Sequence, residues 1–102
     1  MLYNFVLSPS AKQDLQDIMW YKAEYDPDYA IAFVDKLVDR FKQTLSTFPR
    51  SGTFHNKQKN IRKITFEGYT TFYRVTEALE TIDVLRIVGQ GKPLEARGID
   101  FS

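Results

Sequence analysis

The sequence predicts an α+β fold in which an antiparallel β-sheet carries a helical hairpin on one face, in the order β-α-α-β-β-β. Three observations predict it: an apolar run near the N-terminus, two amphipathic segments with only a short connection between them, and three strand-like runs in the second half. The 102 residues, 43% of them apolar, suffice for one hydrophobic core but not for two. We therefore expect a single domain over residues 1–102.

The first element is predicted to be a strand over residues 2–7, which are rich in β-forming side chains. Ser8 and Pro9 follow, and they suit the N-cap and the first position of a helix. Apolar side chains then recur at helical spacing, with most polar side chains on the other faces. This pattern predicts a first helix over residues 9–24.

A second helix is predicted over residues 27–48. Asp26 and Pro27 repeat the N-cap signal, and a long apolar stripe follows them. The connection between the two helices is only a few residues, so the helices should pack side by side and antiparallel. After them, residues 53–60 are polar and are expected to form a loop that leads into the sheet.

Three further strands are predicted over residues 61–66, 69–76 and 81–88. The first two flank Glu67-Gly68, a plausible two-residue turn because glycine accepts positive φ. Such a turn pairs Phe66 with Tyr69, Ile64 with Thr71 and Arg62 with Tyr73, and the face that these residues share with Val75 is the expected core face. The other face would carry Lys63, Thr65, Thr70, Arg74 and an exposed Phe72. The last run has apolar side chains on both faces, which predicts a central strand covered on both sides.

Several function classes are disfavoured by composition. The sequence has no Cys and one His, so thiolate chemistry and clustered zinc ligands are not expected, and we predict neither a metal nor a cofactor. His55 lies in a polar segment without a recognisable catalytic motif. Asp14 and Asp17 are expected on a solvated helix face. No apolar run is long enough for a membrane span, and a cytoplasmic location is the default expectation.

Charge is distributed unevenly along the chain. The net charge is only +1, but between residues 50 and 74 six Lys or Arg stand against one acid, a local charge of +5. Cations here and nearer the C-terminus are candidates for contact with phosphates or with an acidic protein surface, and Phe72 could stack on an unpaired base. A solvated, merely solubilising sheet face is the other interpretation. The cations concerned are Arg62, Lys63, Arg74, Arg86, Lys92 and Arg97.

Aromatic side chains gather at the junction of the two predicted helices, at Trp20, Tyr21, Tyr25 and Tyr29. Not all of them can face inward, because they occupy adjacent positions around the helices. An exposed aromatic group of this kind would suit an anchor site for a partner protein.

The order and spacing of several short segments resemble the toxins of the ParE and RelE type from toxin–antitoxin systems. The resemblance covers nearly the whole chain. Pro49 and Gly52, together with the long second helix, look more like the ParE branch. The segments that carry the resemblance are residues 8–18, Trp20-Tyr21, Ala30 and Phe33, Leu45 with Phe48-Pro49-Arg50-Ser51-Gly52, Ile61-Arg62-Lys63, Tyr69, Phe72-Tyr73-Arg74-Val75, and residues 82–88.

This resemblance implies a non-enzymatic toxin that binds and inhibits DNA gyrase and forms a hetero-oligomer with a cognate antitoxin. The implied target-binding residues are Arg62, Lys63, Phe72, Arg74, Arg86, Lys92 and Arg97. The antitoxin is expected over the helical hairpin, at Trp20, Tyr21, Tyr25, Tyr29, Val34 and Val38.

Two alternatives stay open within the resemblance. One is a RelE-like, ribosome-dependent endoribonuclease of messenger RNA, in which Arg62, Lys63 and Arg74 would hold the scissile phosphate. In this chain Thr65 and Thr70 stand where that pattern has cations, and its basic, aromatic or His positions near the C-terminus map onto Gly89, Gln90, Gly91 and Arg97. The other alternative is an inactive homologue that is retained as an antitoxin-binding module.

Overall fold

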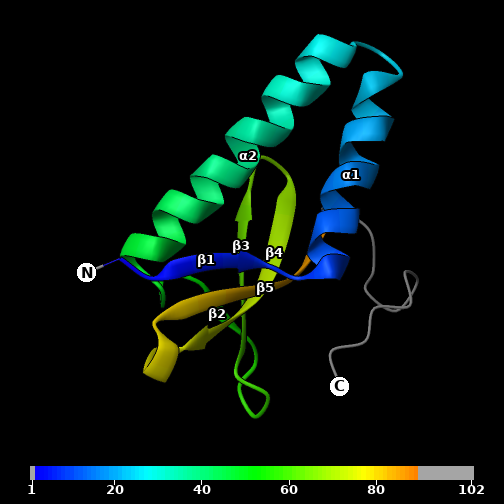
Figure 1. Ribbon diagram of the computed structural model, residues 1–102. Coiled ribbons are helices and arrows are strands. Elements are labelled where there is room, and N and C mark those ends of the chain that lie inside the picture. Colours follow the sequence, from blue (N-terminus) through cyan, green and yellow to red (C-terminus); the bar gives the residue numbers. More distant parts are fainter. Residues whose placement is uncertain (1, 90–102) are drawn as a thin grey trace.

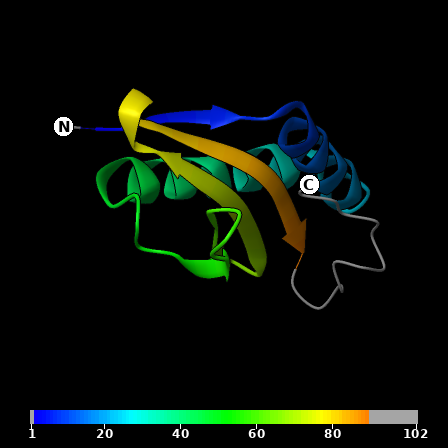
Figure 2. The ribbon, with the colours of Figure 1, turned by 90° about the horizontal axis from the view of Figure 1, so that it is seen from below.

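The computed structural model describes residues 2–89, which form a five-stranded sheet and two helices (Figures 1 and 2). The predicted α+β class and the order of the predicted elements are confirmed. The strands lie in the order β1-β5-β4-β3-β2, so β5 is an interior strand between β1 and β4, in line with the prediction of a strand with neighbours on both sides. The elements are β1 (Asn4–Leu7), α1 (Pro9–Ala23), α2 (Pro27–Thr47), β2 (Thr53–Asn56), β3 (Ile61–Phe66), β4 (Tyr69–Thr76), the short 3-10 helix η1 (Glu77–Leu79) and β5 (Thr81–Gly89).

Both helices begin at the predicted caps. The Ser8 hydroxyl accepts a hydrogen bond from the Ala11 N–H at 3.0 Å, and the Asp26 carboxylate accepts one from the Tyr29 N–H at 3.2 Å. Each bond satisfies a backbone donor that the first helical turn leaves without a partner. Ser8 also donates to the carbonyl of Leu85 at 2.9 Å, so the start of α1 is fixed on β5.

Pairing in the sheet is antiparallel for three of the four neighbouring pairs, and β1 is the exception. It runs parallel to β5, with Asn4 opposite Thr81 and Leu7 opposite Val84. Both helices and three strands separate β1 from β5 along the chain, so no tight turn imposes an antiparallel arrangement. The sheet is therefore mixed rather than wholly antiparallel.

The edge strand β2 replaces part of the loop that was predicted for residues 53–60. It pairs antiparallel with β3, and the register shifts between Phe54 and Asn56. Its first three side chains are exposed. An exposed edge strand needs no alternation of apolar and polar residues. The polar sequence of β2 therefore resembled a loop, and the strand was not predicted.

The β3–β4 hairpin has the predicted register. Phe66 lies opposite Tyr69, Ile64 opposite Thr71 and Arg62 opposite Tyr73. At the turn, Glu67 and Gly68 have φ angles of 52° and 80°, the positive values that a type I′ turn requires at both central residues.

Phe72 was predicted to be an exposed ring, and this was wrong because its side chain is only 4% exposed. The pairing of β4 with β5 shifts register between Phe72 and Tyr73, and both rings are buried. Phe72 packs with Ile61 and Val88 in a small second core. A stacking platform for bases is therefore not available at this position.

The main core lies between the helices and the sheet. It joins Ala11 and Leu15 of α1 and Val34 and Leu45 of α2 to buried side chains of β4 and β5. The helices converge at the α1–α2 connection and extend beyond the sheet there (Figure 1). Within residues 2–89, no helix is both long enough and apolar enough to cross a membrane.

Candidate functional site

The cations of the sheet region differ in how far they are available to a partner. Lys63 on β3 is exposed. Arg62, half-buried, places its guanidinium 4.0 Å from the centre of the Phe54 ring and donates to the carbonyl of Gly52 at 2.9 Å. Arg74, also half-buried, donates from Nε to the carbonyl of Lys59 at 3.0 Å. Both arginines thus fix the surrounding backbone.

Arg86 is held in an ion pair with Asp14 instead of lying on the predicted exposed surface. Its Nε and Nη2 atoms donate to the two carboxylate oxygens at 2.7 and 2.9 Å. Asp14 is only 4% exposed and also accepts from the backbone N–H of Ile87 at 2.9 Å. The expectation of a solvated Asp14 was therefore wrong. Hydrogen bonding to Asp14 raises the pKa of Arg86, which keeps its positive charge and secures α1 on β5.

Two hydroxyls occupy the outer end of the hairpin. Thr65 and Thr70 lie opposite each other on β3 and β4, with their Oγ1 atoms 2.7 Å apart. They are the positions at which the ribonuclease pattern has cations, and here they offer no positive charge to a phosphate. Lys92 and Arg97, the remaining candidate cations, lie outside the described residues.

The turn before β2 is joined to the sheet by Tyr73. Its hydroxyl oxygen accepts a hydrogen bond from the Gly52 N–H at 3.0 Å. A Cβ atom at position 52 would lie 2.5 Å from that oxygen and 2.5 Å from the carbonyl oxygen of Lys63, so only glycine fits. Burial raises the pKa of Tyr73, and its side chain has no solvent exposure. This phenol holds the fold together and is not accessible to a substrate.

His55 is exposed on β2, and its ring packs edge-on against Phe72 with 4.9 Å between ring centres. No group of three His, Cys, Asp or Glu side chains within residues 2–89 is arranged to hold a metal ion. The exposed side chains of this region include Lys63, Thr65 and His55.

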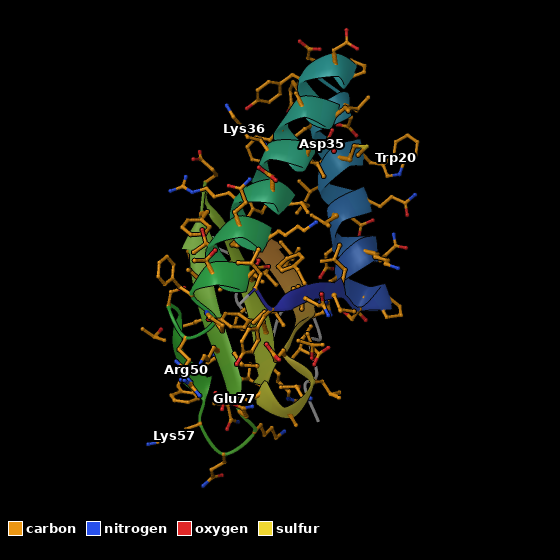
Figure 3. The ribbon with its side chains drawn as sticks, turned by 60° about the vertical axis from the view of Figure 1, so that its left-hand side comes forward. Trp20, Asp35, Lys36, Arg50, Lys57 and Glu77 are labelled. Atoms are coloured by element: carbon orange, nitrogen blue, oxygen red, sulfur yellow. The ribbon has the colours of Figure 1, made fainter. Side chains whose placement is uncertain are left out.

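A second candidate surface, the aromatic tip, lies where α1 and α2 meet. Trp20 is 68% exposed and points away from α1 (Figure 3). Tyr21, Tyr25 and Tyr29 are 61%, 79% and 54% exposed. Tyr21 and Tyr25 pack edge-on with 6.2 Å between ring centres, and Tyr29 packs against Phe33 at 5.9 Å. All four predicted aromatic side chains are thus exposed on the helical hairpin.

The two valines predicted beside them differ from this group. Val34 is 5% exposed and belongs to the main core, so its prediction as a partner contact was wrong. Val38 is partly buried and packs against the same core. Both lie on the apolar stripe of α2 that faces the sheet, and the aromatic tip lies nearer the start of that helix.

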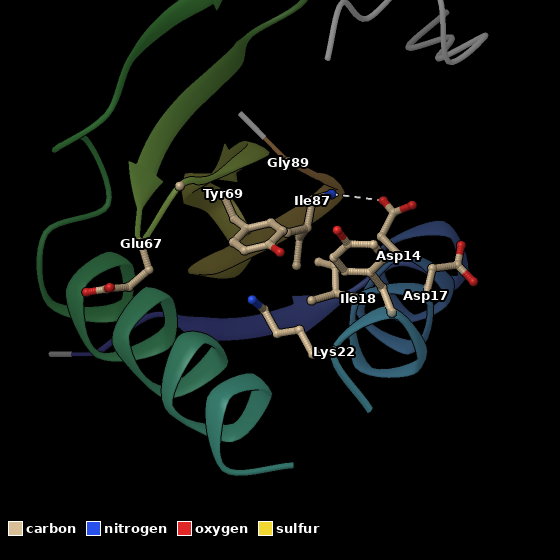
Figure 4. Close-up of a pocket in the computed structure, with 10 residues that line it drawn as sticks. Asp14, Asp17, Ile18, Lys22, Glu67, Tyr69, Ile87 and Gly89 are labelled. Carbon is tan, nitrogen blue, oxygen red and sulfur yellow. Dashed lines mark hydrogen bonds between the residues drawn. The ribbon is translucent and has the colours of Figure 1, made fainter. Parts of the chain in front are cut away.

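A pocket of about 500 Å³ opens between α1 and the end of the β3–β4 hairpin (Figure 4). Lys22 enters it from α1, and its Nζ lies 4.1, 5.8 and 5.9 Å from the ring centres of Phe33, Tyr69 and Tyr29. Sequence reasoning missed this aromatic enclosure of an ammonium group. One signal was present, since Lys22 continues the apolar stripe of α1.

The model of the family described as the ParE toxin of the type II toxin–antitoxin system parDE matches residues 5–93. A search of curated proteins gave no significant match.

Solved structures with similar folds include toxin–antitoxin complexes. The chromosomal ParDE system from P. aeruginosa superposes with a TM-score of 0.72 at 20% identity, covering 87% of this chain and 97% of the other. The RelBE2 complex from M. tuberculosis has a TM-score of 0.64 at 19% identity, covering 90% and 95%. The isolated RelE toxin of E. coli has a TM-score of 0.56 at 15% identity, covering 94% and 93%.

These structural similarities establish a shared fold, and the family model covers most of the sequence, from the second residue of β1 through both helices to the end of β5. The chain belongs to the family of ParE toxins of type II toxin–antitoxin systems.

Proposed function

We propose that this chain is a non-enzymatic toxin that binds and inhibits DNA gyrase and is neutralised by a cognate antitoxin. The observation that carries the proposal is the engagement of the arginines. Arg62 and Arg74 bond to backbone carbonyls, and Arg86 is paired with a buried carboxylate. Binding of a protein target through a surface is compatible with arginines that are bonded within the fold. Cleavage of RNA is less compatible, because it needs cations that are free to hold the phosphate.

Cleavage of RNA makes stricter demands on a site. Positive charges must meet the developing charge on the phosphate, and a proton-transfer group must stand near the ribose hydroxyl. In the RelE-like interpretation the holding cations are Arg62, Lys63 and Arg74, of which Lys63 alone is exposed on the strand surface. The Thr65–Thr70 pair supplies hydroxyls where further cations would be needed. Inhibition of gyrase asks only for a complementary surface, and the family match favours it.

The antitoxin is proposed to cover the aromatic tip. Large exposed aromatic side chains are the residues that most often dominate binding energy at protein interfaces. Trp20 and Tyr25 are the most exposed of the four. Solved relatives include complexes of a toxin with its antitoxin, which supports a hetero-oligomer here. Because gyrase acts on DNA inside the bacterial cell, the proposal also places the chain in the cytoplasm.

Two assays test the proposed target. Purified chain is added to a gyrase supercoiling reaction and, separately, to ribosomes programmed with messenger RNA. We expect loss of supercoiling and intact transcripts. Cleaved transcripts with normal supercoiling would replace gyrase with the ribosome, and inertness in both assays would mean that this homologue is inactive.

A pair of charge-reversal variants locates the surface that acts on gyrase. Lys63→Glu should weaken inhibition, whereas Lys36→Glu, an equal change of charge on exposed α2, should not. Equal inhibition by both variants would remove Lys63 from the proposed target surface.

A further inference from the structure

The loop between β2 and β3 displays lysines at the end of the sheet away from the aromatic tip. Lys57 and Lys59 lie in this loop, Lys63 follows on β3, and all three are exposed. Figure 3 shows Lys57 at the end of the molecule opposite Lys36 and Trp20. No carboxylate within residues 2–89 forms an ion pair with any of the three lysines. Their positive charges are therefore available to a partner.

The loop is held in a defined position by hydrogen bonds. The Asn60 side-chain amide donates to the carbonyl of Val75 at 3.1 Å, and Arg74 Nε donates to that of Lys59 at 3.0 Å. Within the loop, the Lys59 N–H donates to the Asn56 side-chain oxygen at 3.1 Å. Two side chains thus tie the loop backbone to β4. Because the backbone is already ordered, binding through the lysines would cost less conformational entropy than binding through an unstructured tail.

Nearby acids are engaged elsewhere. Glu77 forms an ion pair with Arg50. Asp83, opposite Arg74 in the sheet, accepts a hydrogen bond from the Thr76 hydroxyl at 3.0 Å. Between residues 50 and 74 the sequence contains six Lys or Arg and a single acid, Glu67. Glu67 lies at the opposite turn and pairs with Arg40 of α2. Glu77 and Glu67 are thus neutralised by arginine partners, and none of these three acids forms an ion pair with the lysines.

We propose that the β2–β3 loop binds the phosphate backbone of duplex DNA. Lysine is depleted at the centres of protein–protein interfaces, whereas lysine and arginine are the groups that neutralise nucleic-acid phosphates. The β2–β3 loop projects from the edge of the five-stranded sheet, so its lysines can reach phosphates along the wide major groove of B-form DNA, whereas the major groove of A-form RNA is too narrow for side chains to enter. DNA binding by this loop goes beyond the proposed inhibition of gyrase. Because it is tested with DNA alone, each of the two proposals can fail while the other holds.

The charge of the helical hairpin favours one orientation of the protein on DNA. Between residues 11 and 49 there are five Lys or Arg and seven Asp or Glu, a difference of −2. A phosphate backbone would be attracted to the β2–β3 loop and repelled from the helical hairpin. DNA bound in this orientation leaves the aromatic tip accessible.

The test is fluorescence anisotropy of a labelled duplex DNA titrated with the full chain at increasing salt. Three phosphate contacts predict an affinity loss of roughly fortyfold between 50 and 200 mM salt, with a log–log slope of about −2.7. The double variant Lys57→Glu/Lys59→Glu should weaken binding at least tenfold and reduce the magnitude of the slope to about 0.9 or below. The matched control is Lys36→Glu/Lys42→Glu, the same change of charge on exposed positions of α2, which should keep most of the affinity.

Three outcomes would overturn the proposal. Equal weakening by both double variants would show that only net charge matters. Tighter binding of a duplex RNA of the same sequence, lost in the Lys57/Lys59 variant, would assign the loop to RNA. Binding of polyglutamate with no binding of DNA would assign it to an acidic protein. Circular dichroism melts of both variants establish that each is folded before binding is compared.

Discussion

Asp14 of α1 and Arg86 of β5 form a two-point ion pair across the interface between the first helix and an interior strand of the sheet. Arg86 is 22% exposed at its side chain, and Asp14 is 4% exposed. The third hydrogen bond to Asp14, from the Ile87 N–H, joins the same carboxylate to the strand backbone. The pair therefore sets where α1 lies on the sheet.

Removing one partner should be strongly destabilising. We expect Asp14→Ala to lower the free energy of unfolding by about 3–5 kcal/mol, because it leaves the Arg86 charge and the Ile87 N–H without their acceptor. Urea unfolding followed by circular dichroism measures it. Arg40→Gln is the control, since it breaks the exposed pair with Glu67 and should cost about 0–1 kcal/mol. Similar losses in the two variants would contradict an anchoring role for Asp14.

A methyl group at position 52 should disturb the turn before β2. Gly52→Ala would bring a Cβ to 2.5 Å from both the Lys63 carbonyl oxygen and the Tyr73 hydroxyl, and we expect a loss of about 1–3 kcal/mol. Gly89→Ala is the matched change, because its Cβ would meet only the Tyr69 ring at 3.6 Å. Thermal unfolding compares the two, and an unaffected Gly52→Ala protein would show that the turn can move away from β4.

Stability should fall above the ordinary tyrosine pKa of 10.0, since burial raises the pKa of Tyr73 in the folded chain. As pH rises through 10.0, Tyr73 loses its hydroxyl proton first in the unfolded chain, and this deprotonation favours unfolding. The contribution of Tyr73 to the free energy of unfolding is therefore complete below this pH and declines above it. Melts at increasing alkaline pH measure the slope. Tyr73→Phe removes the titrating group and should flatten the slope, although it loses the Gly52 hydrogen bond at a cost of about 1 kcal/mol. The same slope in both proteins would contradict the assignment.

The aromatic tip should carry much of the antitoxin affinity. Alanine at Trp20 or Tyr25 is expected to weaken binding by about 2 kcal/mol, roughly thirtyfold, while leaving the unfolding midpoint unchanged. Isothermal titration with a cognate antitoxin measures the loss. Leu79→Ala provides the control, because Leu79 is 70% exposed but lies on η1. Unchanged affinity in both aromatic variants would place the antitoxin elsewhere.

Local features of the sequence predicted local structure well. Ser8-Pro9 and Asp26-Pro27 start the two helices, and Glu67-Gly68 forms the hairpin turn with the expected register. Each of these signals depends on neighbouring residues and on backbone geometry, both of which can be read along the chain. The aromatic tip was predictable for the same reason, because helical spacing shows that its rings cannot all face inward.

The residues that were placed wrongly depend on distant partners. Phe72 is buried because Ile61 of β3 and Val88 of β5 pack against it and the His55 ring of β2 lies on it, and none of these partners belongs to β4. Asp14 is buried because Arg86, 72 residues away, provides its counter-charge. One sign of this was available: Asp14 lies three residues after Ala11 and one before Leu15, on the stripe of α1 that faces the core. A carboxylate on that stripe indicates a buried partner and not a solvated face.

The parallel pairing of β1 with β5 has a consequence for folding during synthesis. β1 is synthesised first but finds its neighbour only when residues 81–84 have been made, and Ser8 also waits for the carbonyl of Leu85. Among the described strands, β5 is thus synthesised last, and contacts of such long sequence separation slow folding. A nascent chain that stops before β5 holds an incomplete sheet and unpaired strand edges. The sheet of the described residues can therefore be completed only after both helices and the other four strands have been synthesised.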